Sequence, residues 1–120
     1  MGLENTYFKN PTGLDIDEIT GILSNTSTAE ETARMIGYAL RYPLIRSIHK
    51  VPSTIFSQNG TPHVISPTHT ILVNEPGVIS GKTGFTDTAG GTLATVAEIP
   101  MGKLTIIVVL NSTLIERFED

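Results

Sequence analysis

The sequence has no cysteine, little positive charge and no long apolar run. The lack of cysteine excludes disulfides and thiolate-bound zinc, although it leaves the redox compartment open. The eight Lys and Arg residues are scattered and the formal net charge is −4, so no surface for nucleic acid is expected. The three histidines are isolated and lack the spacing of metal ligands, so neither a metal nor a cofactor is expected.

Hydrophobicity sets further limits. The longest apolar run, Leu104 to Leu110, is too short to span a bilayer and predicts a buried strand. The first residues lack the pattern of a signal peptide, so any export signal of a parent protein is expected outside this chain. With 120 residues, of which 39% are hydrophobic, the chain can form one modest core. Residues 1–120 are therefore predicted to be a single domain or part of one.

Two helices are predicted in the first half of the chain. Ser27 and Thr28 each precede a glutamate by three residues, which gives two overlapping capping boxes ahead of apolar residues at helical spacing. Those apolar positions are Ala29, Ala33, Ile36, Gly37 and Leu40. A second, shorter helix is predicted to begin at Pro43 and to run through Ile48. Residues 5–15, with Asn-Pro and Thr-Gly pairs, predict an irregular loop.

Strands are predicted in the second half. Residues 53–57 and 61–65 flank Gln58-Asn59-Gly60 and predict a β-hairpin, which Pro62 would confine to a sheet edge. Residues 78–85, 92–99 and 103–111 predict a three-stranded antiparallel meander with its last strand inside a larger sheet. Residues 115–120 have the pattern of a helix start, so the chain is expected to be truncated there. The fold class is therefore α+β.

The stretch GVISGKTGFTDTAGGTL, from Gly77 to Leu93, suggests two chemistries. A phosphate-binding loop needs two glycines separated by four residues before Lys-Thr, but only three residues separate Gly77 from Gly81. The residues after Thr83 are also poor helix formers, whereas a phosphate-binding loop continues into a helix. The pattern therefore disfavours a phosphate-binding loop and leaves open the alternative, a wall of an acyl-transfer site.

Four segments resemble one family in the order in which they occur: GLENTYFKNPTGLD, STAEETARMIGYAL, GKTGFTDTAGGTLA and KLTIIVVLNS. They are similar to the serine D-alanyl-D-alanine carboxypeptidases, the low-molecular-weight penicillin-binding proteins. The resemblance implies a partial DD-peptidase/β-lactamase-like domain, the C-terminal half of a catalytic domain. Members carry a Ser-x-x-Lys nucleophile, a Ser-x-Asn and a Lys-Thr-Gly strand. A serine β-lactamase is a related alternative with less similarity around Phe-Thr-Asp.

The resemblance implies roles for five residues. Lys82 and Thr83 would bind the terminal carboxylate of the peptide, Gly84 would allow its close approach, and Arg117 would help to hold the carboxylate. The backbone N–H of Phe85 would be one donor of the oxyanion hole. The residues themselves also allow plainer interpretations: Lys82 as a solvated edge charge, Arg117 as an exposed helix charge, and residues 86–88 as a turn.

Two serine motifs are interpreted as coincidental. Ser47-Ile48-His49-Lys50 matches Ser-x-x-Lys but comes after the Asn-Pro-Thr-Gly-Leu loop, late in a short helix. Ser57-Gln58-Asn59 matches Ser-x-Asn but begins a hairpin turn. Ser66-Pro67-Thr68-His69 stands where the family usually has Asn-Thr-Asn, and His69 is expected to organise a loop. Gly91 stands where family members commonly carry a larger residue. The nucleophile is therefore expected outside this chain.

The resemblance also implies a function for the parent protein. It would be an extracytoplasmic serine hydrolase that removes D-Ala from peptidoglycan stem peptides ending in D-Ala-D-Ala, and it would bind β-lactam antibiotics. The chain alone is expected to be inactive and to self-associate through an uncovered sheet face. The alternative is a non-enzymatic peptide-binding or structural module completed by another chain.

Overall fold

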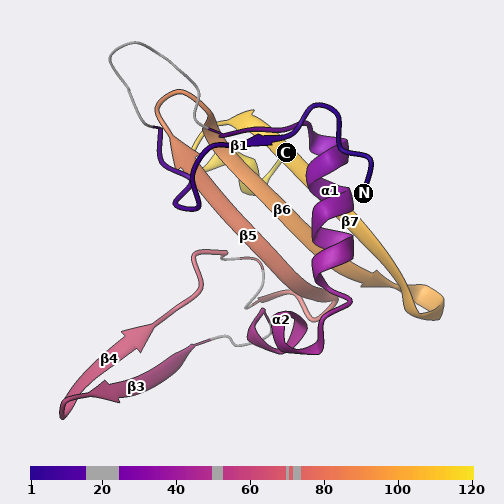
Figure 1. The fold of residues 1–120 in the computed structure, drawn as a ribbon. Helices are drawn as coiled ribbons and strands as arrows, with labels where there is room; N and C mark the ends of the chain where they lie inside the picture. Colours follow the sequence, from indigo (N-terminus) through magenta and orange to yellow (C-terminus); the bar gives the residue numbers. More distant parts are fainter. Residues whose placement is uncertain (16–24, 50–52, 70, 72–73) are drawn as a thin grey trace.

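A three-stranded antiparallel sheet forms the centre of the computed structural model, which describes residues 1–15, 25–49, 53–69, 71 and 74–120. Its strands β5 (Val78–Thr86), β6 (Gly90–Ile99) and β7 (Lys103–Ser112) lie in the order β5-β6-β7 (Figure 1). The predicted meander is confirmed, with slightly longer strands and a shorter first connection. Among the described residues β5 has a neighbouring strand on one side only, so its other edge is free.

The pairing of residues across the strands gives the sheet two distinct faces. Directly paired residues lie on the same face, and neighbours along a strand alternate between faces. Lys82 pairs with Ala94 and so belongs to one face, whereas Thr83 pairs with Leu93 on the other. The buried apolar core lies in the middle strand and comprises Leu93, Ala94 and Val96.

Helix α1 (Ala29–Ala39) covers the face that carries Lys82. Gly37 lies so close to β7 that a Cβ there would come within 3.3 Å of Cδ1 of Ile106. Helix α2 (Pro43–Ile48) begins at Pro43, as predicted. At its end, Nδ1 of His49 lies 2.7 Å from the hydroxyl of buried Ser80, so α2 is attached to β5.

The start of α1 forms half of the expected capping box. The Thr28 hydroxyl accepts a hydrogen bond of 3.2 Å from the backbone N–H of Glu31. The Glu31 carboxylate does not complete the box; it accepts hydrogen bonds from the backbone of Glu4 and Asn5 and from the Thr6 hydroxyl. These donors, Thr6 foremost, lower the pKa of Glu31 against the opposing effect of desolvation. The carboxylate thus attaches the N-terminal segment to the helix.

The segment expected to be an irregular loop contains one short strand. β1 (Tyr7–Phe8) pairs antiparallel with β2 (Asn25–Thr26). After it, the side-chain oxygen of Asn10 accepts hydrogen bonds from the backbone N–H groups of Thr12 and Gly13, which closes a tight turn. Residues 10–14 thus form the turn that the Asn-Pro and Thr-Gly pairs predict.

The hairpin forms where the sequence predicts it. β3 (Thr54–Gln58) pairs with β4 (Thr61–Ile65), and Asn59 and Gly60 at the turn have φ angles of 52° and 81°. The expected attachment to a sheet edge is wrong, because the hairpin is a separate two-stranded sheet that projects from the body (Figure 1). Every residue of both strands is exposed.

The C-terminal residues fold back against the sheet. A 3-10 turn, η1 (Pro100–Gly102), joins β6 to β7, and a second, η2 (Glu116–Phe118), replaces the predicted α-helix start. The chain passes so close to Gly91 that a Cβ there would lie 2.0 Å from the carbonyl oxygen of Thr113. A larger residue is therefore excluded at position 91. None of the helices in the described part of the chain has the length and apolarity to cross a membrane.

Candidate functional site

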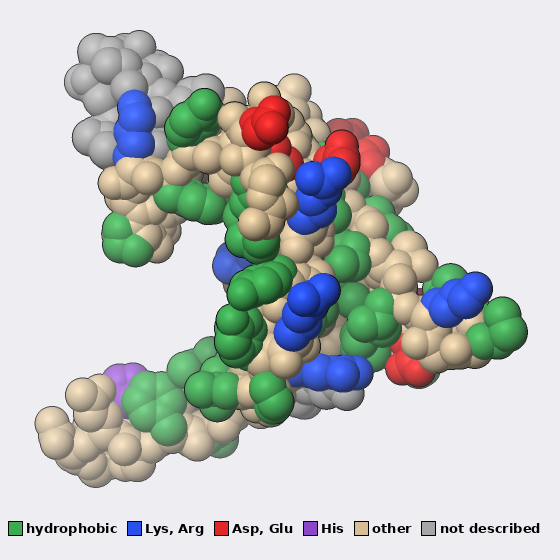
Figure 2. All heavy atoms as spheres, turned by 45° about the vertical axis from the view of Figure 1, so that its right-hand side comes forward, with side chains coloured by type: hydrophobic (Ala, Val, Ile, Leu, Met, Phe, Trp, Pro, Cys, Tyr) green, Lys and Arg blue, Asp and Glu red, His purple; other side chains and the backbone are tan. Residues whose placement is uncertain are grey.

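The free edge of β5 borders a hollowed side of the molecule, between the projecting hairpin and the N-terminal loop (Figure 2). One cavity, of about 450 Å³, is lined by Ile48, His49, Thr54, Ile65, Ser66, Pro67, Gly81 and Lys82. A second, of about 700 Å³, lies between residues 8–14 and the end of β5. Lys82 lines both cavities and is the side chain that links them.

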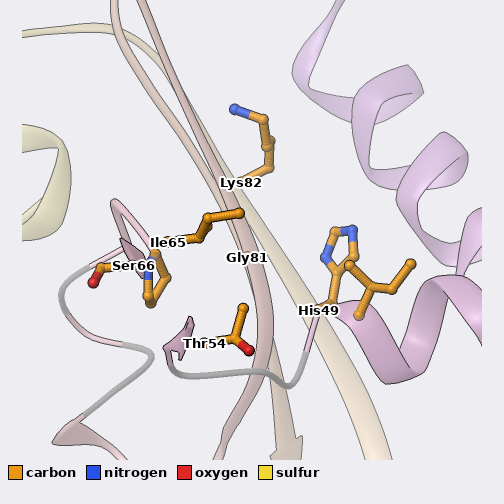
Figure 3. Close-up of a pocket in the computed structure, with 8 residues that line it drawn as sticks. His49, Thr54, Ile65, Ser66, Gly81 and Lys82 are labelled. Atoms are coloured by element: carbon orange, nitrogen blue, oxygen red, sulfur yellow. The ribbon is translucent and has the colours of Figure 1, made fainter. Parts of the chain in front are cut away.

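Lys82 is exposed and extends from β5 away from Thr54 and Ser66 (Figure 3). Its ammonium group donates a hydrogen bond to the carbonyl of Thr83. Lys9 also lines the second cavity, and no Asp or Glu side chain is among the described residues that line either cavity. Two ammonium groups without a carboxylate beside them favour an anionic ligand.

Thr83 lies on the opposite face of the sheet from Lys82. Its side chain is 8% exposed, and its hydroxyl oxygen lies 2.5 Å from that of Thr68. The strand therefore does not direct the Lys82 ammonium and the Thr83 hydroxyl into one cavity. No local sequence pattern predicts the contact between Thr68 and Thr83, because the two residues are 15 positions apart in the chain.

Gly84 and Phe85 continue the edge strand. A Cβ on Gly84 would lie 2.5 Å from the hydroxyl of Thr92 on β6, so packing within the sheet is itself a reason for glycine. The Phe85 side chain is half exposed and lines the second cavity, as Gly84 does. Both residues therefore lie at the wall where the resemblance implies a bound peptide.

Arg117 is buried rather than an exposed helix charge, with 7% of its surface accessible. Its guanidinium donates to the carbonyl of Gly84 at 2.7 Å and lies 4.9 Å from the ring of Phe118. A second, longer contact of 3.4 Å joins it to the carbonyl of Thr92. Arg117 thus meets the Lys-Thr-Gly strand through backbone carbonyls.

His69 organises the loop before β5, as its sequence context suggests. It is 2% exposed, and its Nε2 lies 2.8 Å from the hydroxyl of buried Thr95. Desolvation, with a smaller contribution from the charge of Arg117, lowers the pKa of the ring. Gly81 makes room for it, because a Cβ there would lie 2.0 Å from Cδ2 of His69.

The serines of the two motifs lie away from the cavities, although Ile48 and His49 of the first motif line the first cavity. Ser47 lies within α2 and donates a hydrogen bond of 2.8 Å to the carbonyl of Leu44. Lys50 lies outside the described residues. Ser57 lies in the exposed strand β3 and pairs with Pro62, and Asn59 follows in the turn. Neither serine lines either cavity, and no group of three or more His, Asp or Glu side chains in the described part is placed to bind a metal.

Comparison with known proteins defines the class. The family model for D-alanyl-D-alanine carboxypeptidase matches residues 1–113. The chain therefore belongs to the D-alanyl-D-alanine carboxypeptidase family, whose members are hydrolases. Among curated proteins it is similar to the D-alanyl-D-alanine carboxypeptidase DacB2 of Mycobacterium tuberculosis, with 30% identity over 89 residues. That match covers 74% of this chain and 29% of the relative.

Solved structures give the same class. A penicillin-binding protein homologue from M. tuberculosis aligns with a TM-score of 0.80 and 28% identity, over 93% of this chain and 41% of that one. A D-alanyl-D-alanine carboxypeptidase from M. tuberculosis H37Rv aligns with a TM-score of 0.78 and 28% identity, over 92% and 40%. A Streptomyces K15 DD-transpeptidase variant aligns with a TM-score of 0.71 and 25% identity, over 87% and 43%. The fold is thus a partial DD-peptidase domain.

Proposed function

We propose that this chain forms the Lys-Thr-Gly wall of the substrate groove of a serine D,D-carboxypeptidase that acts on peptidoglycan stem peptides ending in D-Ala-D-Ala. The observation that carries the proposal is the position of Lys82, exposed on the free edge of β5 and shared by two cavities without a carboxylate in their described lining. A terminal carboxylate in that position would form a charge-assisted hydrogen bond with the ammonium group.

The free edge of β5 supports a binding mode for the peptide backbone. An edge strand has unpaired N–H and C=O groups, which can pair with an extended peptide. The peptide would lie along Lys82 to Phe85, with its carboxylate at the lysine. The N–H of Phe85 would then donate to the carbonyl oxygen of the scissile bond, where negative charge develops.

The chemical steps require a serine from outside this chain. That serine would attack the carbonyl carbon of the penultimate D-Ala, and the terminal D-Ala would leave with the proton that the serine loses. Water would then hydrolyse the acyl-enzyme ester and regenerate the serine. A β-lactam would acylate the same serine. This parent enzyme would act outside the cytoplasm, where its peptide substrate is found.

The proposal predicts that the 120-residue chain alone is inactive. Ser47 is hydrogen-bonded within its own helix and Ser57 lies in the exposed hairpin, so neither serine is placed for acylation. Incubation with a labelled penicillin should leave the intact mass unchanged. An adduct on Ser47 would show that its motif is functional.

A titration followed by amide NMR tests the groove directly. Diacetyl-L-Lys-D-Ala-D-Ala should shift the resonances of residues 82–85 in the chain, and the same peptide with a C-terminal amide should shift them much less. The L-Ala-L-Ala isomer controls for nonspecific binding. Equal shifts with the acid and the amide would contradict the assignment of Lys82 to the carboxylate.

One observation favours a second candidate, a binding module completed by another chain. Leu104 and Ile107 on β7 are 47% and 52% exposed and lie on opposite faces of the sheet, so this outer strand presents apolar surface on both faces. Such a surface tends to recruit a partner. Sedimentation at increasing concentration should therefore show self-association, and a monomer at all concentrations would count against it.

A further inference from the structure

We infer that Asn25 is a positioning residue of the groove: its carboxamide fixes the loop of residues 9–14 as the wall that contacts the peptide residue before D-Ala-D-Ala. The inference rests on the proposed function and adds a residue outside the Lys-Thr-Gly strand. Three hydrogen bonds of one side chain support it. The Oδ1 atom of Asn25 accepts from the backbone N–H groups of Lys9 at 2.8 Å and of Asn10 at 3.2 Å. Its Nδ2 donates to the carbonyl of Asn10 at 3.1 Å.

Asn10 holds the rest of the loop in the same way. Its side-chain oxygen accepts from the backbone N–H groups of Thr12 at 3.0 Å and of Gly13 at 2.9 Å. Its Nδ2 donates to the carbonyl of Leu14 at 3.0 Å. Each of the two carboxamides therefore uses both its acceptor and its donor on the backbone of the loop. Asn25 fixes Asn10, and Asn10 fixes the residues that follow, so the two side chains act in series.

The loop lies across the larger cavity from the edge strand β5. Residues 8–14 and Asn25 form one side of this cavity of about 700 Å³, and the other side consists of Lys82, Gly84 and Phe85. The described lining of the smaller cavity includes Gly81 and Lys82 of β5 but not Phe85. The larger cavity is therefore the one at the Phe85 end of the groove.

The direction of the proposed peptide decides which of its residues meets the loop. The terminal carboxylate lies at Lys82 and the carbonyl of the scissile bond at Phe85, so the residue before D-Ala-D-Ala lies at the Phe85 end. That residue therefore enters the larger cavity, between Phe85 and the loop. A loop that is fixed before binding loses less conformational entropy when it makes this contact. Asn25 thus strengthens binding of the upstream residue, whereas the D-Ala-D-Ala end depends on β5.

Two peptides of different length test this role in the 120-residue chain. NMR titration gives the dissociation constants of diacetyl-L-Lys-D-Ala-D-Ala and of acetyl-D-Ala-D-Ala, which lacks the upstream residue. The longer peptide is also measured as its C-terminal amide.

The variants are Asn25→Ala, Asn10→Ala, the double variant and Asn25→Asp, which keeps the oxygen that accepts from both N–H groups. Gln58→Ala, which removes an exposed carboxamide on the hairpin, is the matched control. Thermal melts report whether each variant folds, and Asn25→Ser replaces Asn25→Ala if the latter does not.

The expected result is a loss that depends on the length of the peptide. Asn25→Ala should lower the affinity for the longer peptide about tenfold and that for the shorter peptide less than about twofold, because only the longer one contacts the loop. The double variant should be no weaker than the weaker single variant, because the two side chains act in series. Asn25→Asp should retain most of the advantage of the longer peptide. Its added charge acts on the C-terminal carboxylate of both peptides and so cancels in their ratio. Gln58→Ala should match the wild type.

The outcomes separate this inference from the proposed function. Equal losses for both peptides in Asn25→Ala would show a general structural role, which overturns the inference and leaves the groove standing. The same holds if the wild-type chain binds the longer peptide no more tightly than the shorter one, because the loop would then not be a wall of the groove. If the wild-type chain does not distinguish the acid of the longer peptide from its amide, the proposed groove fails, and the role of Asn25 fails with it.

Discussion

The β5–β7 sheet and the β3–β4 hairpin are both antiparallel, yet different forces hold them. The sheet contains the buried residues Leu93, Ala94 and Val96 and has α1 on one face and η2 against its strands. The hairpin has no buried residue and contacts the body little (Figure 1). Its form depends on a turn at Asn59-Gly60, where both residues have positive φ. Strand pairing alone thus does not place residues in a site; burial against other elements does.

The largest expected effect concerns two glycines, one in each region. Gly91→Ala should cost about 3 kcal/mol or more of folding free energy, because its Cβ would overlap the backbone of Thr113, which cannot move aside cheaply. Gly60→Ala has open space but a φ of +81°, so it should cost only about 1 kcal/mol. Urea unfolding of both variants measures the difference in folding free energy. Equal losses of stability would contradict the view that the sheet is closely packed and the hairpin is not.

Substitution of Lys82 should weaken substrate binding without lowering the stability of the fold. In the complete enzyme, Lys82→Ala should lower kcat/KM by roughly ten- to a hundredfold, because a charge-assisted contact worth about 1.5–3 kcal/mol is lost. The melting temperature should not change, since the side chain is exposed. Phe85→Ala is the control, because only its backbone is proposed to act. Wild-type acylation by penicillin in Lys82→Ala, with loss in a folded Phe85→Ala, would refute the groove assignment.

Two valines, one in the sheet and one in the hairpin, allow the packing of the two regions to be compared. Val96 is fully buried in β6, so Val96→Ala should cost about 2 kcal/mol through lost burial and a residual cavity. Val64 on β4 is 69% exposed, and Val64→Ala should change stability by no more than about 0.5 kcal/mol. Chemical unfolding of the pair provides the measurement. A comparable loss at Val64 would mean that the hairpin is covered in solution.

The smallest expected effect is a dependence of stability on pH through His69. Burial lowers its pKa in the folded state, so the unfolded chain takes up a proton at higher pH than the folded chain does. Its stabilising contribution should be complete above the ordinary histidine value of about 6.5 and should fall as the pH drops from there through the lowered folded pKa. Melting temperatures between pH 7.5 and 5 measure this, with His69→Gln as the variant that should flatten the curve. An unchanged slope in that variant would show that other groups are responsible.

The sequence by itself determined the elements whose signals are local. The helix after Thr28, the turn at Asn59-Gly60 and the three strands of the meander follow from periodicity, caps and turn residues within a few positions. The Lys-Thr-Gly strand of the family also predicted that Lys82 lies on a strand of the sheet. Each of these depends on neighbours in the chain or on a motif, and so could be predicted.

Only the tertiary structure decided which distant groups meet. Glu31 leaves its capping box for the N-terminal segment, Arg117 turns inward to the carbonyl of Gly84, and Thr68 meets Thr83 on the face opposite Lys82. The separation of the hairpin from the sheet was likewise not predictable, because no pattern within its residues specifies a partner strand. A hydrogen bond between distant residues depends on how whole elements pack. A buried polar group without a hydrogen-bond partner costs free energy, so the stable fold is one in which packing brings a donor or acceptor within reach of each such group.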